Sequence, residues 1–291
     1  MNPTSKRASI YAILAAILYA ISSPISKILL DSLSPTMMAA LLYLGAGLGM
    51  LIMGSVTKWT QQNKPEKSLT KQEWPFILGM ILLDIAAPIL LMNGLNHTTA
   101  ANVSLLNNFE IVATSLIAFI FFGEKISPRL WIAIILVTIA SILLSIEDVG
   151  SLSFSIGSIF VLLACICWGL ENNVTRKLSD KNPIQIVVIK GLGSGAGALI
   201  IAALLNEIRG DAGHILVALL LGFVAYGLSI YFYVRAQRDL GAAKTSSFYA
   251  SAPFFGVIFS FLIFRDIPSS SFLTPLIIMA VGAYLSASDH G

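Results

Sequence analysis

The chain contains two similar halves. Residues Ser9-Ile10-Tyr11 are matched 149 positions later by Ser158-Ile159-Phe160. Further matches follow in the same order: Leu14-Ala15 with Leu163-Ala164, Tyr19 with Trp168, Lys27 with Arg176, Gly45, Gly47 and Gly49 with Gly193, Gly195 and Gly197, Ala100-Ala101 with Ala242-Ala243, Phe119 with Phe261, and Glu124 with Asp266. An internal repeat of this length constrains the fold to two copies of one unit, residues 1–150 and 151–291.

The composition is that of a protein that spans a membrane. Apolar residues make up 56% of the chain and charged residues only 11%, against about 25% charged residues in soluble proteins. A stretch of about 20 mainly apolar residues is long enough to cross a bilayer. The sequence has ten such stretches, at about residues 8–30, 36–57, 75–95, 98–122, 130–146, 156–177, 184–205, 214–236, 242–264 and 270–287. We therefore predict an all-α integral membrane protein with ten transmembrane helices.

Each half of the chain supplies five of these spans. Because five is an odd number of crossings, the second half enters the bilayer from the opposite side. Inverted repeats of this kind are related by a pseudo-two-fold axis in the membrane plane, which is the usual architecture of secondary transporters.

The distribution of basic residues predicts the orientation. With the N-terminus inside, fourteen Lys and Arg residues lie at inner span ends and only Lys27, Arg209 and Arg265 at outer ends. Positive charge on the cytoplasmic side determines orientation, so we expect a multi-pass protein of the cell (plasma or inner) membrane with both termini in the cytoplasm. These residues do not indicate nucleic-acid binding. The expected partners are the lipid bilayer and a small-molecule substrate. The few polar residues of spans five and ten leave a homodimer open.

Glu110 is the foremost candidate for a substrate or proton site. It lies near the middle of the fourth span, and Asn107, Glu110 and Thr114 share one helix face because they are three and four residues apart. A charge at the centre of a span costs about 2.5–3.5 kcal/mol on insertion scales, so it faces the bundle interior or a wet cavity. The alternative is a Glu that only holds helices together.

Asp84, near the middle of the third span, is the second candidate. If Asp84 and Glu110 share a cavity, repulsion between two carboxylates keeps a proton on one of them, and the pair can exchange a proton for a cation. Lys190 is expected to pair with Asp84, Glu110 or Glu171, and the sequence does not choose among them. Three carboxylates against one lysine leave two negative charges, which favours a cationic substrate or proton coupling over an anionic substrate.

Aromatic residues are expected to complete the pocket. Tyr19 and Trp168 are partners in the repeat, and Tyr226 and Tyr249 lie in the eighth and ninth spans, with Tyr249 matching Asn107. Such rings can hold an ammonium group by cation–π attraction. Aromatic belts at the membrane surface are the competing explanation for each ring taken singly.

The chain resembles the EamA family of the drug/metabolite transporter superfamily. The resemblance rests on the two inverted sets of five spans, on Phe121-Phe122-Gly123-Glu124 at the end of the fourth span, and on Phe264-Arg265-Asp266 in the second half. It implies a carrier of small metabolites with a central cavity formed largely by spans three, four, eight and nine. The family usually has a proline in both the fourth and ninth spans. This chain keeps Pro253 but has Ile111 at the matching position.

The sequence contains no motif of an enzyme. It has no phosphate-binding GxxxxGK[ST] loop, and no histidine has a neighbour suited to share a metal, so we expect no cofactor and no metal. The favoured function is secondary active transport of small metabolites (amino acids, amines or related compounds) in the export direction, by alternating access and with proton exchange as the coupling. Two alternatives remain: a multidrug or polyamine-like cation exporter, and a membrane scaffold or lipid-handling subunit without transport activity.

Overall fold

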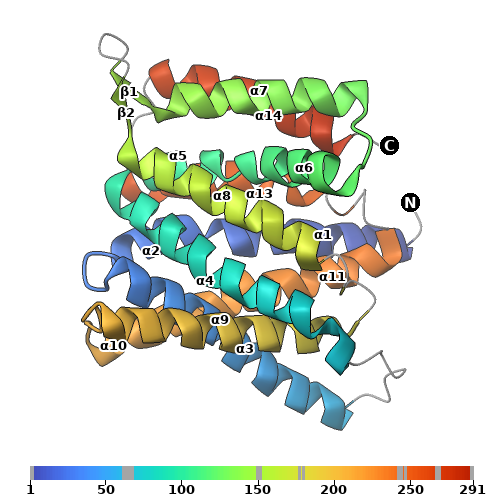
Figure 1. Cartoon of the computed structure of the whole chain (residues 1–291), viewed down its shortest axis with the longest axis vertical. Helices are drawn as coiled ribbons and strands as arrows, with labels where there is room; N and C mark the ends of the chain where they lie inside the picture. Colours follow the sequence, from blue (N-terminus) through green and yellow to red (C-terminus); the bar gives the residue numbers. More distant parts are fainter. Residues whose placement is uncertain are drawn as a thin grey trace.

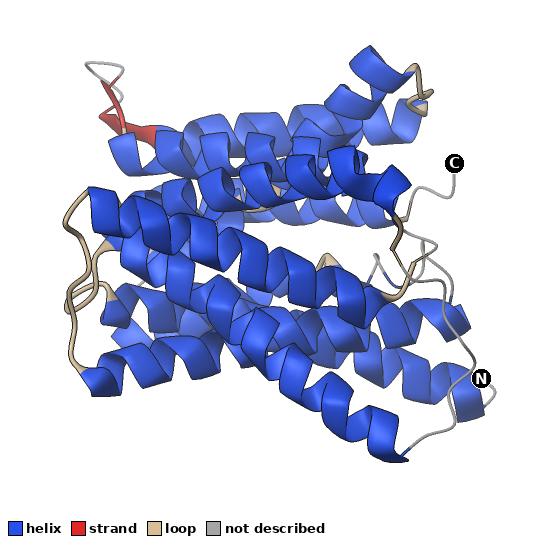
Figure 2. Ribbon diagram, turned by 60° about the horizontal axis from the view of Figure 1, so that its bottom comes forward, coloured by secondary structure: helices blue, strands red, loops and turns tan. Residues whose placement is uncertain are grey.

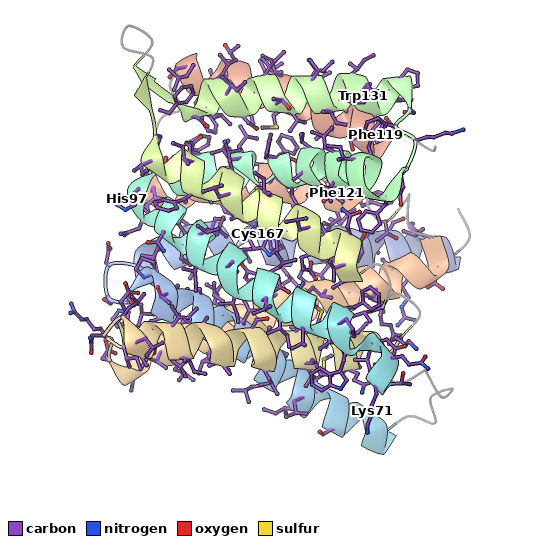
Figure 3. All side chains as sticks on the ribbon, viewed as in Figure 1. Lys71, His97, Phe119, Phe121, Trp131 and Cys167 are labelled. Carbon is purple, nitrogen blue, oxygen red and sulfur yellow. The ribbon has the colours of Figure 1, made fainter. Side chains whose placement is uncertain are left out.

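The computed structural model describes residues 3–60, 69–148, 153–175, 178, 181–240, 245, 248–265 and 270–288. Within these ranges the chain is helical apart from short connections and one small hairpin (Figures 1 and 2). Helix α1 begins and helix α14 ends at the same end of the bundle, which we call the near end (Figure 1). His97 lies at the opposite end, the far end, as Figure 3 shows.

The helices and strands have the following bounds. The helices are α1 (Pro3–Ala20), α2 (Ser22–Leu29), α3 (Pro35–Thr60), α4 (Trp74–His97), α5 (Ala100–Leu106), α6 (Phe109–Phe122), α7 (Pro128–Ser145), α8 (Ile156–Thr175), α9 (Pro183–Leu204), α10 (Ala212–Gly222), α11 (Ser229–Leu240), α13 (Ala252–Phe264) and α14 (Ser270–Ala287). A short 3₁₀ helix, Lys71–Glu73, precedes α4, and a π-helical turn, Phe223–Leu228, joins α10 to α11. Strands β1 (Ile146–Asp148) and β2 (Ser153–Phe154) pair antiparallel.

The described helices form a multi-pass membrane protein. Eight helical segments are long and apolar enough to cross a bilayer, and two shorter apolar helices, Ala252–Phe264 and Ser271–Ala287, accompany them. Large apolar side chains cover the outside of the bundle, for example Leu82 (65% exposed) and Phe121 (72% exposed). Such a surface is expected of helices in contact with lipid, because the lipid tails replace water around it.

Local sequence determines where several helices begin and end. The Thr99 hydroxyl accepts a hydrogen bond from the Asn102 N–H at the start of α5, and the Ser127 hydroxyl accepts one from the Leu130 N–H at the start of α7. Both satisfy backbone donors that the first helical turn leaves free. Helix α6 ends at Gly123, whose φ of 67° lies in the left-handed region that glycine adopts without strain.

Glycines bring α3 and α9 into close contact. A Cβ on Gly47 would lie 2.6 Å from the Leu192 backbone nitrogen, and a Cβ on Gly191 would lie 2.5 Å from the Gly47 nitrogen. No side chain fits at either distance, so the two backbones meet directly, as small residues allow in membrane helices. The glycine repeat of the two halves therefore serves tight packing at this contact.

Two membrane segments are interrupted near their middle. Helix α1 ends at Ala20 and α2 begins at Ser22, and Pro24 has no N–H to donate to the carbonyl of Ala20. Helix α5 ends at Leu106 and α6 begins at Phe109, although no proline is present there. The Asn108 side chain instead donates to the Leu105 carbonyl at 3.2 Å, and the backbone tightens to bonds three residues apart. Helix α13 begins at Ala252, just before Pro253. Its repeat counterpart α6 begins at Phe109, two residues before Ile111, so the break at Asn107 and Asn108 forms without a proline.

The helices pack in pairs drawn from both halves of the chain. Helix α3 packs on α9, α4 on α8, and α1 on α11, while α7 and α14 lie together along one edge of the bundle (Figure 1). Phe119 of α6 and Trp131 of α7, both labelled in Figure 3, meet edge to face at 5.7 Å and join this edge pair to the rest. The pairing leaves room for a cavity between the interrupted segments.

Candidate functional site

A cavity of about 680 Å³ lies inside the bundle. It reaches the near end, where Thr175, Ser286 and Ala287 line it, and it stops at Asn107 and Asn108. Beyond these two residues, nearly all of α5 is buried, which closes the cavity toward the far end. A cavity of this size accommodates a small metabolite.

Glu110 lies in the wall of this cavity, in the first turn of α6. Asn172 of α8 donates its side-chain amide to Glu110 Oε1 at 2.7 Å and to Thr114 Oγ1 at 3.3 Å. Among the described residues, Glu110 has no ion-pair partner. Asn107, Glu110 and Thr114 all line the cavity, so the face expected from their spacing is the one that meets the interior. The site therefore holds a carboxylate whose hydrogen-bond partner is neutral.

Asp84 is placed behind the cavity wall. Its side chain is fully buried, its Oδ1 accepts a hydrogen bond from the Tyr43 hydroxyl at 2.9 Å, and its Oδ2 lies 3.0 Å from Lys190 Nζ. Tyr43 and Lys190 line the cavity in front of it, whereas Asp84 does not. The structure thus does not bring Asp84 and Glu110 together on the cavity surface, because Asp84 faces the packed contact of α4 with α3 and α9.

Lys190 bridges two carboxylates. Its Nζ lies 3.0 Å from Asp84 and 3.1 Å from Glu171 Oε1. Trp168, three residues before Glu171 on α8, points its indole N–H at the Tyr43 hydroxyl across 3.4 Å. These contacts close a ring through α8, α3, α4 and α9. The sequence left the partner of Lys190 open among three carboxylates, and the structure assigns it to two of them.

Five tyrosines form a continuous wall of the cavity. The ring centroids of Tyr43 and Tyr226 are 5.5 Å apart, those of Tyr226 and Tyr19 5.7 Å, those of Tyr19 and Tyr249 6.0 Å, and those of Tyr249 and Tyr233 5.0 Å. All five line the cavity, together with Trp168. The expected aromatic residues Tyr19, Trp168, Tyr226 and Tyr249 are therefore brought together in one wall.

The π-helical turn Phe223–Leu228 carries Tyr226 into this wall. One extra residue in a helical turn redirects a side chain, and such turns are frequent at functional sites. Ser22 of α2 donates its hydroxyl to the Tyr226 hydroxyl at 3.4 Å. The interrupted first segment therefore also contacts the aromatic wall.

The polar lining residues that were not expected from the sequence include Asn108, Asn172 and Tyr43. Asn172 stands directly after Glu171 in a mainly apolar segment. A polar side chain inside such a segment could have indicated a residue that faces the cavity. Tyr43 gave no such signal, because a tyrosine in a span is common near either membrane surface. Tyr233 stands with Tyr226 in the eighth span, where aromatic residues were expected to complete the pocket.

Several residues of the sequence argument lie outside the described residues, namely Arg176, Ala242-Ala243 and Asp266. Lys27, the repeat partner of Arg176, donates its ammonium group to the carbonyls of Leu95 and Asn96 at 2.6 and 3.3 Å, at the end of α4. In the described part of the chain, no group of three or more His, Cys, Asp or Glu residues is arranged to hold a metal ion.

The fold and the cavity define a multi-pass membrane protein with a polar chamber between its helices. The chain belongs to the EamA-like transporter family, whose profile matches residues 6–146 and 155–288. It is a membrane transporter and not an enzyme.

Two relatives carry transporter names. Over 270 residues the chain is 26% identical to an "Uncharacterized transporter" of Methanothermobacter thermautotrophicus, covering 87% of this chain and 78% of the relative. Over 249 residues it is 24% identical to the "Uncharacterized transporter YyaM" of Bacillus subtilis, covering 82% and 80%. A solved crystal structure with 15% identity superposes with a TM-score of 0.66 over 96% of both chains, a likeness of fold alone.

Proposed function

We propose that this chain is a secondary transporter that exports small amine-bearing metabolites by alternating access, and that Glu110 binds the amine. The observation that carries this proposal is the environment of Glu110. Its carboxylate faces a metabolite-sized cavity, and its hydrogen-bond partner Asn172 is neutral. A charge in such a place is stabilised by an opposite charge on the substrate or by a proton.

The charge balance of the cavity favours an amine over a carboxylate. Lys190 is the basic residue among those that line it, and this lysine is already held by Asp84 and Glu171. A substrate carboxylate would have to compete with both of them. The unpaired carboxylate at Glu110 offers an ammonium group a partner without such competition.

The tyrosine wall supports the same substrate class. Tyrosine and tryptophan faces attract a desolvated cation by about 2 kcal/mol or more. Tyr19 and Tyr249 line the same cavity as Glu110. An ammonium group bound at Glu110 would therefore lie beside aromatic rings.

The pairing of helices supports ten spans in two inverted repeats. The family profile matches the chain once in each half. A pseudo-two-fold axis would exchange the α1–α11 pair with the α8–α4 pair and would keep the α3–α9 and α7–α14 pairs, and all four pairs pack together. We propose the unit boundaries 1–150 and 151–291 on this basis.

The asymmetry of the cavity supports alternating access. The cavity reaches the near end and is closed at the far end by α5. We propose that the near end lies on the cytoplasmic side of the cell (plasma or inner) membrane, because it carries the excess of basic residues. Release on the other side then requires the far end to open and the near end to close.

Proton exchange is the proposed coupling. A proton on Glu110 and an ammonium group at Glu110 neutralise the same charge, so the two exclude each other. Asp84 remains a proposed second proton group, acting through Lys190 rather than by direct contact with the substrate. Exchange of one proton for one monoamine cation moves no net charge, whereas a polyamine carries more charge than the proton and a zwitterionic amino acid carries less. The current produced by these two kinds of substrate should therefore depend on the pH gradient.

Electrophysiology on proteoliposomes, with the protein on a solid-supported membrane, tests the proposal. Amines, amino acids and polyamines are applied to the unmodified protein, to Glu110→Gln and to Asp31→Asn, which removes an exposed carboxylate. The proposal expects a current from a polyamine or a zwitterionic amino acid that Glu110→Gln abolishes and Asp31→Asn leaves intact. A Glu110→Gln protein that folds and retains the current disproves the role of Glu110. Loss of folding in Glu110→Gln, with no current from the unmodified protein, favours a scaffold.

A further inference from the structure

Two arginines at the near end lie over tyrosine rings. The Arg7 guanidinium carbon is 5.4 Å from the centre of the Tyr11 ring, and its Nε donates to the Tyr11 hydroxyl at 2.8 Å. The Arg235 guanidinium carbon is 5.6 Å from the centre of the Tyr231 ring, and its Nη1 donates to the Tyr231 hydroxyl at 2.8 Å. Each guanidinium is therefore held in place by a ring and a hydroxyl.

The two arginines lie at the same level of neighbouring helices. Helices α1 and α11 pack together, and Tyr11 stacks on Phe232 with ring centroids 5.5 Å apart. Arg7 is four residues from Tyr11 and Arg235 three residues from Phe232, both toward the near end. At a rise of about 1.5 Å per residue, their levels differ by only about 1.5 Å. The stacked rings thus place the two arginines at the same level of two helices that pack together.

Neither arginine has an acidic partner within the described residues. In the described structure, Arg7 and Arg235 each contact their tyrosine. Among the neighbours whose side chains are described, Lys6 adds to the positive charge, and Asp239 is exposed and makes no ion pair with Arg235. Two cations at the same level of neighbouring helices attract an anion.

We propose that Arg7 and Arg235 bind the phosphate of an anionic phospholipid in the leaflet at the near end. A guanidinium offers two parallel N–H groups that match two phosphate oxygens. Each tyrosine hydroxyl accepts a hydrogen bond from one nitrogen of its arginine, and the other N–H groups of the guanidinium remain available to the lipid. Headgroup phosphates lie at the level where a membrane helix ends. Arg7 lies in the second turn of α1, and Arg235 lies five residues before the end of α11.

The site has a direct relation to the cavity. The helices that it joins also carry Tyr19 and Tyr233, which line the cavity wall. A phosphate held between Arg7 and Arg235 would link α1 to α11 at the end of the bundle that the cavity reaches. The proposal does not depend on the substrate or on Glu110.

Lipid binding to the purified full chain tests this site. Native mass spectrometry in detergent measures the affinity for phosphatidylglycerol, for phosphatidylcholine with the same acyl chains, and for inorganic phosphate alone. The variants are Arg7→Lys and Arg235→Lys, which keep the positive charge but lose the two parallel N–H donors of the planar guanidinium. Lys6→Gln is the matched control, because it removes an exposed neighbouring charge that touches no ring.

The expected result is tighter binding of phosphatidylglycerol than of phosphatidylcholine. Each arginine-to-lysine variant should weaken phosphatidylglycerol binding at least about tenfold, as loss of a charged hydrogen bond predicts. Lys6→Gln should weaken it by about fivefold or less, the effect of one surface charge. Unchanged binding in both lysine variants would mean general attraction to a basic surface and would overturn the proposal. Competition by inorganic phosphate at equal concentration would assign the site to a soluble anion and would also overturn it.

Discussion

The Asn172 side-chain amide donates to the Glu110 carboxylate across 2.7 Å and thereby joins α8 to α6 at the cavity wall. A second asparagine follows it, and Asn173 donates to the Thr114 carbonyl at 3.1 Å and to the Gly169 carbonyl at 2.8 Å. Asn172 therefore fixes the orientation of the proposed amine-binding carboxylate, while Asn173 holds the two helices together.

Replacing Asn172 should weaken amine binding. In Asn172→Ala, Glu110 loses a hydrogen bond to a charged group, worth about 1.5–3 kcal/mol, and the carboxylate is no longer held toward the cavity. We expect the amine concentration for half-maximal current to rise at least about tenfold. Asn93→Ala is the matched control, because within the described part of the chain the Asn93 amide donates only to the Ile89 carbonyl of its own helix. Equal effects of the two substitutions would contradict the assignment.

Replacing Lys190 should destabilise the fold. Lys190→Met leaves Asp84 and Glu171 without the cation that lies 3.0 and 3.1 Å from them. Removing one partner of a buried ion pair costs about 3–5 kcal/mol. Thermal unfolding in detergent should show a lower midpoint, and the double variant Asp84→Asn/Lys190→Met should recover part of the loss. If the double variant is no more stable than Lys190→Met, the ion pair between Asp84 and Lys190 does not contribute to the stability of the fold.

Replacing Tyr249 should distinguish the contribution of its ring to amine binding from that of its hydroxyl. Tyr249→Phe keeps the aromatic face and should leave amine affinity within about twofold, whereas Tyr249→Leu should lower it by about 0.5–2 kcal/mol of cation–π attraction. Both affinities follow from the concentration dependence of the substrate current. If Tyr249→Phe lowers the amine affinity as much as Tyr249→Leu does, the hydroxyl and not the ring binds the substrate. The Tyr249 hydroxyl lies 3.4 Å from the Ser229 hydroxyl.

Replacing Gly47 should disturb the α3–α9 contact. In Gly47→Ala the new methyl group would meet the Leu192 backbone nitrogen at 2.6 Å, and backbone cannot move aside cheaply. Overpacking of this kind costs about 1–3 kcal/mol, measurable as a lower unfolding midpoint. Gly79→Ala is the control, since its methyl group would meet only the Val174 side chain, at 3.2 Å. A control as unstable as Gly47→Ala would exclude the backbone contact as the cause.

Much of the fold could be predicted from the sequence, because membrane insertion acts on single segments. The apolar stretch containing Leu82 must be helical in lipid, since every backbone N–H and C=O there needs a partner within the segment. The shared face of Asn107, Glu110 and Thr114 likewise follows from helical spacing alone. The break at Asn107 and Asn108 was harder to predict, because the Asn108 side chain, and not a proline, accompanies it.

The sequence by itself determined the membrane class, the approximate segments and the candidate carboxylates, because these depend on local hydrophobicity and helical periodicity. Only the tertiary structure decided which polar groups meet. Asp84 pairs with Lys190 behind the cavity wall, and Glu110 meets Asn172 rather than Asp84. These partners come from helices far apart in the chain, and their contact depends on how the helices cross. Helix crossing is set by packing of the whole bundle, which no single segment encodes.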